Sequence, residues 1–162
     1  EKIRHKTCKS HKEKSKITLT RLAMSPYGLL QEEINYDPWK IFVCCIFCNL
    51  TKRVSAEPYF RQVLRLWPQP SKLAYASESE VAAVIKPLGL SKRRAKALVR
   101  MSKDYLSKEW QDDPTKLYGI GKYGSDAYKI FCTPFWKEVE PKDGALVNYH
   151  NWLREFEDAR RT

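Results

Sequence analysis

The stretch 116-KLYGIGKYGSDAYKIF-131 decides the fold class of this 162-residue chain. Gly119 and Gly121 flank one apolar residue, Ile120, and apolar residues then recur at helical spacing from Tyr123 onward. Because glycine tolerates positive φ, this pattern predicts a tight hairpin that leads directly into a helix. The N–H groups of such a hairpin and of the helix start can hold a phosphate without reading a base. An ordinary turn between two helices explains the glycines equally well.

Helix signals dominate on both sides of the hairpin. Ser25 and Asp37 each precede a proline at a first helical position, and Ser77 with Glu80 has the spacing of a capping box. No stretch alternates apolar and polar residues for long, so we expect no strand. The predicted fold is all-α, with about eight to ten short helices. The main predicted helices span 25–34, 37–51, 56–67, 77–89, 91–110, 123–132 and 145–161.

The charge of the chain favours an acidic partner. Its formal net charge is +11, and residues 1–21 hold eight Lys/Arg against two Glu. A nucleic acid is the first candidate, although ribosomal, histone-like and membrane-surface proteins share such a charge. We predict a basic flexible arm at 1–21 and one domain at 22–162; a solvated tail explains the arm equally well. No apolar run approaches the ~20 residues that span a bilayer, so we expect no membrane association.

The five cysteines are Cys8, Cys44, Cys45, Cys48 and Cys132. Cys45 and Cys48 form a C-x-x-C that could bind a metal or react with oxidants. No second cysteine or histidine pair completes a zinc site, and three of these cysteines lie in an apolar run, where free cysteine packs as a small hydrophobe. We therefore interpret them as core residues, expect no metal or cofactor, and infer an intracellular compartment from the reduced thiols.

The segment LYGIGKYGSDAYKIF resembles the hairpin of the helix–hairpin–helix DNA glycosylase superfamily, and IKPLGLSKRRAKAL resembles the loop and helix before it. The motifs DPWK, IKPLGL, RAK, GIGKYG, YKIFC and YHNWL narrow the resemblance to one family. They are similar to the catalytic domain of the methyl-CpG-binding-domain glycosylases, plant-like members included, from about Gln31 to Leu153. The resemblance implies the helix–hairpin–helix glycosylase fold, with a cleft between two helical lobes. It covers no methyl-CpG-binding domain.

The resemblance also implies the reacting groups. Asp143 matches the catalytic Asp of the family, with Glu140 as the other carboxylate in that loop; from the residues alone, Asp143 reads as a helix N-cap. Tyr123 stands where endonuclease III-like enzymes carry a nucleophilic Lys. A phenol cannot form a Schiff base, so we expect Tyr123 to line the base pocket of an enzyme without lyase activity. No cysteine follows Cys132, so an iron–sulfur cluster is not expected.

Other residues match family positions that contact DNA. Gln31, with Leu30 beside it, matches a residue whose amide contacts the flipped pyrimidine, and Leu90 matches an apolar wedge. Leu50 stands where animal members carry a gap-filling Arg, for which Lys52 or Arg53 is a candidate substitute. Solvent exposure of Gln31, core packing of Leu90 and a solvated basic face are the ordinary alternatives. The predicted phosphate contacts are Gly119, Gly121, Lys122, Lys92, Arg93 and Arg94.

The resemblance predicts a monofunctional glycosylase for thymine or uracil opposite guanine. Such an enzyme hydrolyses the N-glycosidic bond, leaves an abasic site and starts base excision repair of deaminated cytosines. We expect a nuclear monomer whose partner is double-stranded DNA with G·T or G·U mismatches. A non-catalytic helix–hairpin–helix DNA-binding module and a bifunctional glycosylase-lyase are the alternatives.

Overall fold

The computed structural model describes residues 24–162, so the predicted arm at 1–21 lies outside the described residues. The described part contains α-helices, short 3₁₀ turns and loops, and no strand. The all-α prediction is therefore confirmed. The α-helices are α2 (Leu30–Glu33), α3 (Pro38–Cys48), α4 (Arg53–Leu66), α5 (Pro70–Ala74), α6 (Glu78–Ile85), α7 (Ser91–Ser107), α8 (Lys122–Cys132) and α9 (Gly144–Ala159).

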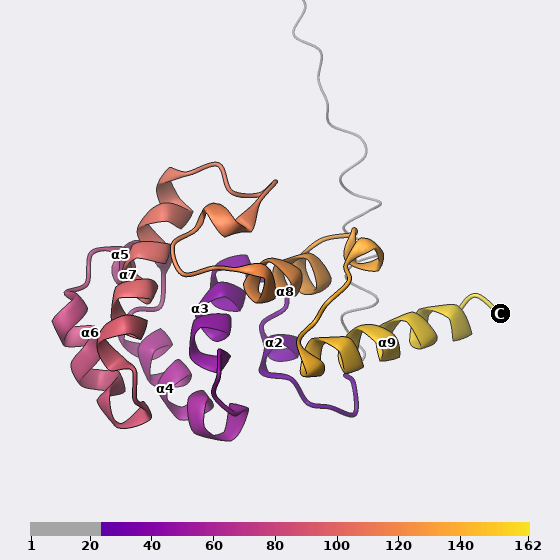
Figure 1. Cartoon of the computed structure of the whole chain (residues 1–162), viewed down its shortest axis with the longest axis horizontal. Coiled ribbons are helices and arrows are strands. Elements are labelled where there is room, and N and C mark those ends of the chain that lie inside the picture. The colour runs from indigo at the N-terminus through magenta and orange to yellow at the C-terminus, as the bar shows by residue number, and fades with distance from the viewer. Residues whose placement is uncertain (1–23) are drawn as a thin grey trace, which may run out of the picture.

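Helix α3 lies at the centre of the molecule. Figure 1 places α4–α7 on one side of α3, and α2, α8 and α9 on the other. Asp37 caps α3 by accepting a hydrogen bond from the Lys40 N–H at 3.2 Å, and Pro38 occupies its first position. Trp39 and Phe42 are almost fully buried, and the Trp39 indole N–H donates to the Ser102 hydroxyl at 3.0 Å. The apolar run of α3 thus forms the core that both groups of helices share.

The cysteines of α3 pack as core residues. Cys44 and Cys45 are buried, Cys48 is half-buried, and all three are free thiols. The Sγ atoms of Cys44 and Cys48 lie 3.9 Å apart. Within residues 24–162, no group of three or more His, Cys, Asp or Glu side chains is arranged to hold a metal ion. No helix of the same part is long and apolar enough to cross a membrane.

The first predicted helix begins later than expected. Helix α2 starts at Leu30, and Ser25 is not its N-cap. Instead, the Glu32 carboxylate accepts hydrogen bonds from the Ser25 N–H at 2.7 Å, the Ser25 hydroxyl at 2.9 Å and the Leu29 N–H at 2.7 Å. These contacts hold the segment before α2 against the helix, because one buried carboxylate accepts all three hydrogen bonds.

Three further details differ from the sequence prediction. Helix α4 begins at Arg53 and includes Pro58, whereas the prediction began at 56. The short helix α5 was not predicted. The Ser77 hydroxyl lies 2.7 Å from the Ser79 hydroxyl and makes no cap, so the predicted capping box with Glu80 is wrong. In the last case a neighbouring hydroxyl outcompetes the helix N–H group.

Candidate active site

The glycine hairpin between α7 and α8 is built as predicted, but its two glycines have different reasons to be there. Gly119 has φ 76°, and a Cβ at this position would lie 3.0 Å from the Ala97 Cβ of α7. Gly121 has φ −108° and open space around its Cβ position. Ile120 is 6% exposed and anchors the turn in the core. Gly119 therefore serves the fold, whereas Gly121, the N-cap of α8, leaves the free N–H groups of the helix start accessible.

A pocket of about 420 Å³ opens beside the hairpin. Its wall comes from the end of α3, the loop after α3, the start of α7 and the hairpin itself. Predicted site residues from distant parts of the chain meet there. They are Leu50, Leu90, Arg93, Arg94, Gly119, Gly121, Lys122 and Tyr123.

Tyr123 joins this pocket to α2. The Gln31 side-chain amide donates to the Tyr123 hydroxyl at 2.9 Å. Burial raises the pKa of the Tyr123 phenol well above its usual range, so the phenol stays neutral. Cys45, which also lines the pocket, has a pKa raised mainly by burial, while the nearby Gln31 and Tyr123 side chains act to lower it. The three side chains make a neutral polar patch. The sequence does not reveal that Cys45 lines the pocket, because its apolar neighbours mark it only as a core residue.

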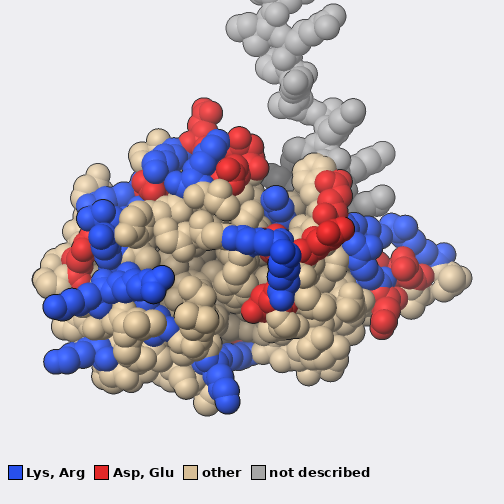
Figure 2. All heavy atoms as spheres, viewed as in Figure 1, with Lys and Arg blue, Asp and Glu red and all other residues tan. Residues whose placement is uncertain are grey.

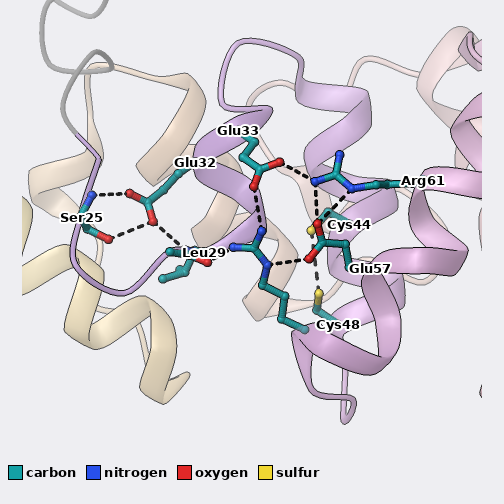
Figure 3. A network of polar contacts seen from close by, with 10 residues as sticks. Ser25, Leu29, Glu32, Glu33, Cys44, Cys48, Glu57 and Arg61 are labelled. Atoms are coloured by element: carbon teal, nitrogen blue, oxygen red, sulfur yellow. Dashed lines mark hydrogen bonds and ion pairs between the residues drawn. The ribbon is translucent and has the colours of Figure 1, made fainter.

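Helix α2 is one turn long and is held from both sides, as Figure 3 shows. Glu32 binds Ser25 and Leu29 on one side. On the other side Glu33 accepts from Arg53 and from Arg61 of α4, each at 2.7 Å, which lowers the pKa of Glu33. These contacts orient α2, and with it Gln31. No sequence pattern announced them, because the partners are about 20 to 28 residues apart.

The predictions that Gln31 and Leu30 of α2 contact the base have different outcomes. Gln31 is 4% exposed, so the alternative of a solvent-facing side chain does not hold. Leu30 is 1% exposed and belongs to the core, so a direct contact of its side chain with a base does not fit the structure. The reason is the direction of α2, which turns Leu30 inward and Gln31 towards Tyr123.

Asp143 is exposed and is the N-cap of α9. Its carboxylate accepts a hydrogen bond from the Leu146 N–H at 3.1 Å. The Asp143 charge adds to the rise in the pKa of Tyr123 that burial mainly causes, so the two groups lie within electrostatic reach. The Lys122 ammonium donates to the Glu140 carbonyl at 3.0 Å and ties the loop before α9 to the start of α8. Asp143 does not itself line the pocket, but its bond to the Leu146 N–H does not prevent it from acting on a nucleotide held there.

Leu50 and Leu90 stand at two loop tips in an unusual backbone conformation. Their φ angles are 57° and 51°, and they are the residues other than glycine with positive φ in the described part of the chain. A left-handed conformation costs a residue with a Cβ roughly 1–2 kcal/mol, and such strain gathers at functional sites. Leu50 is 89% exposed and Leu90 54%, so core packing does not explain Leu90. Both side chains are offered to solvent beside the pocket.

Some of the predicted phosphate contacts are exposed and unpaired in the described residues, whereas others are already bonded to groups of the protein. Lys92 and Arg93 are exposed on the first turn of α7. Arg94 is only 5% exposed and donates to two neighbouring loops that line the pocket, so its prediction as a phosphate contact does not fit. Lys122 is exposed, but its ammonium pairs with Asp126 at 2.6 Å as well as with the Glu140 carbonyl, which turns it along α8.

The candidate substitutes for a gap-filling Arg differ in the same way. Arg53 binds Glu33, Glu57 at 2.9 Å and the Gly28 carbonyl, so it is not available to enter DNA. Lys52 is exposed. Figure 2 shows Lys and Arg side chains gathered over the α5–α7 side of the face in view. Arg93 of α7 lines the pocket, so basic side chains border it without depending on Arg53.

The comparisons with known proteins agree with this geometry. The sequence model of a family described as HhH-GPD superfamily base excision DNA repair protein matches residues 43–159. The chain belongs to the HhH-GPD superfamily. The match contains the hairpin, both strained leucines and Asp143, whereas Gln31 lies before it and reaches the pocket through Tyr123.

Relatives of this HhH-GPD chain carry related names. It is 38% identical over 130 residues to a methyl-CpG-binding domain protein 4-like protein of Arabidopsis thaliana, covering 80% of this chain and 29% of the relative. It is 33% identical over 95 residues to a thymine/uracil-DNA glycosylase of Pyrobaculum aerophilum, covering 55% and 41%. A thymine-DNA glycosylase of Aeropyrum pernix is 37% identical over 67 residues, covering 41% and 30%. The chain thus spans less than half the length of each of these relatives, and the predicted family resemblance is confirmed.

Proposed function

We propose that this HhH-GPD chain is a monofunctional DNA glycosylase that removes thymine or uracil opposite guanine. The observation that carries the proposal is the composition of the site. A neutral Tyr123, bonded to Gln31, stands where a lyase needs an amine, and the Asp143 carboxylate lies close enough to Tyr123 to act on it electrostatically. The names of the archaeal relatives support thymine and uracil as substrates.

The chemistry needs a negative charge near the sugar. A base inside a duplex is inaccessible, so the nucleotide is flipped into the pocket. When the bond between C1′ and the base breaks, the electron pair leaves with the base and positive charge develops on the sugar. Asp143 stabilises that charge and orients a water. The water oxygen bonds to C1′ and gives up a proton, which the base anion finally accepts.

The strand stays intact because no amine attacks C1′. Tyr123 is a buried neutral phenol, and Lys122 next to it is paired with Asp126 and the Glu140 carbonyl. A Schiff base requires a free amine at the sugar. The product is therefore an abasic site, the first intermediate of base excision repair. In this proposal the enzyme acts as a monomer in the nucleus.

Recognition combines the pocket and the surface around it. The Gln31 amide has a donor and an acceptor that match the edge of a pyrimidine, and the Tyr123 hydroxyl adds a second polar contact. Leu90 enters the duplex as a wedge, and Leu50 fills the gap by shape. The N–H groups at Gly121 and the exposed Lys92 and Arg93 hold phosphates, which makes the affinity fall with salt.

Activity on labelled duplexes tests the proposal. The chain is incubated with G·T, G·U and matched A·T duplexes, and the strands are resolved with and without alkali. We expect cleavage only after alkali and only for the mismatched strands. Strands that stay uncut after alkali, with the duplex bound, would favour the non-catalytic DNA-binding module. A covalent adduct trapped by borohydride would contradict the assignment of Tyr123 and indicate a lyase.

A further inference from the structure

The guanidinium of Arg94 connects two loop tips that line the pocket. Its Nη1 donates to the Gly89 carbonyl at 2.9 Å. Its Nη2 donates to the Asn49 carbonyl at 3.3 Å and to the Thr51 hydroxyl. Asn49 and Thr51 are the neighbours of Leu50, and Gly89 directly precedes Leu90. One planar group therefore bonds the backbone next to both strained leucines.

The shape of this group suits such a connection. A guanidinium presents its donors in a rigid plane, whereas a lysine ammonium is a single point of charge on a flexible stem. Arg94 is 5% exposed, and within residues 24–162 it has no carboxylate in an ion pair. Its acceptors are two carbonyls and a hydroxyl from different loops. A buried cation with such partners is costly to keep for packing alone, because its hydration is lost without a compensating anion.

The strained leucines explain what the connection achieves. A Leu at positive φ returns to an extended or helical conformation unless the surrounding structure prevents it. Leu50 and Leu90 make few contacts of their own, since both are largely exposed. Each loop has backbone hydrogen bonds of its own, such as Thr51 N–H to the Cys48 carbonyl and Gly89 N–H to the Lys86 carbonyl, both at 3.2 Å. The side chain of Arg94 adds the bonds that join one loop to the other and so set the separation of the two tips.

We propose that Arg94 is a positioning residue that makes Leu50 and Leu90 enter the duplex as one unit of set spacing. The inference rests on the proposed function, in which these side chains replace the flipped nucleotide. Loss of Arg94 leaves both leucines in place but lets their loops relax independently. Extrusion of the base then becomes less favourable, while contacts with phosphates outside the loops remain.

The test measures extrusion separately from excision. A duplex carries 2-aminopurine beside the mismatched pyrimidine, so its fluorescence rises when the base leaves the stack. Arg94→Met removes all three bonds, Arg94→Lys removes the planar fork, and Thr51→Val removes one acceptor. Arg65→Met, an exposed position on α4, is the matched control for losing one Arg charge. Circular dichroism and melting identify the variants that fold.

We expect Arg94→Met to lower the extruded fraction and the single-turnover rate about tenfold or more, the scale of a lost charge-assisted hydrogen bond. The extruded fraction and rate of Arg94→Lys and Thr51→Val should lie between those of Arg94→Met and the wild type. For all three variants, the affinity for matched duplex should change no more than it does for Arg65→Met. If Arg94→Met does not fold, the inference is tested by Arg94→Lys and Thr51→Val, whose extruded fraction and rate should both lie below those of the wild type.

A double-mutant cycle separates positioning from general damage. Where Leu50 and Leu90 are both changed to Ala, Arg94→Met has little further effect on extrusion. An equal effect in both backgrounds, or a lower melting temperature with normal extrusion, would overturn the inference while leaving wild-type excision intact. A wild type that extrudes the base but does not excise it would instead refute the proposed function, because the fluorescence cycle does not require turnover.

Discussion

Replacing Asp143 by residues that keep or remove its cap separates its two roles. The carboxylate accepts one hydrogen bond, from the Leu146 N–H at 3.1 Å. Asn and Ser retain an acceptor oxygen, so Asp143→Asn and Asp143→Ser should change the free energy of unfolding by less than about 0.5 kcal/mol. Asp143→Ala removes the cap and should cost about 1 kcal/mol, or about 4 °C in melting temperature for a domain of this size.

Activity should follow the charge rather than the cap. All three variants lose the carboxylate, and we expect each to lower the single-turnover rate on a G·T duplex by about 10²–10⁴-fold, the usual contribution of such a group. Binding to the mismatch should persist, because Tyr123 and Gln31 are unchanged. Glu140→Gln removes the other carboxylate of the loop and leaves its carbonyl for Lys122, so this control should keep the activity.

The assay is excision under single-turnover conditions, with melting measured on the same preparations. A rate for Asp143→Asn within about fivefold of wild type would remove Asp143 from the chemistry, since general acid–base and electrostatic roles cost far more. Rates that track melting temperature across the three variants would show that Asp143 serves only as the N-cap.

Three further predictions concern stability and DNA binding. Glu32→Gln turns an amide N–H₂ towards the donors Ser25 and Leu29, so urea unfolding should show a loss of about 1–3 kcal/mol; an unchanged midpoint would contradict the role of this carboxylate. Burial lowers the pKa of His150, so the folded state favours the neutral imidazole. The contribution of His150 to folding stability is therefore complete above the unfolded pKa of about 6.5. It is lost as the pH falls through the lower pKa of the folded state. Melting from pH 7.5 down to more acid pH should show this loss, and His150→Gln should flatten it; equal pH slopes would refute the argument. Leu50→Arg, at an 89% exposed position, should fold normally and make the log–log salt dependence of DNA binding steeper by about 0.9, whereas an unchanged slope would mean that this tip stays away from phosphates.

The sequence predicted those parts of the fold that depend on local patterns. The apolar run of α3 and its Asp37 cap, and the glycine hairpin, are visible in the chain because hydrophobic periodicity, capping and glycine conformation are local properties. The strained conformations of Leu50 and Leu90 are not visible, because leucine rarely adopts positive φ and only the tertiary bonds around these loops impose it.

The partners of individual side chains are not predictable from the sequence. Basic residues near the hairpin all looked alike, yet Arg94 is buried between two loops, whereas Arg93 next to it is exposed. Lys122 pairs with Asp126 one helical turn away, and Arg53 pairs with Glu33 of α2. Which carboxylate or carbonyl lies within reach depends on helix packing, so composition could indicate a basic surface but not which of its members face solvent.

The hydrogen bond between Gln31 and Tyr123 bears on how ordinary bases are rejected. Since these two groups already satisfy each other at 2.9 Å, an incoming base competes with an existing partner instead of meeting idle polar atoms. A ring whose edge cannot replace that bond leaves a deficit of about 1–3 kcal/mol, a disadvantage of roughly 5- to 150-fold. On the proposed function, discrimination then arises from competition at this pair as well as from the size of the cavity.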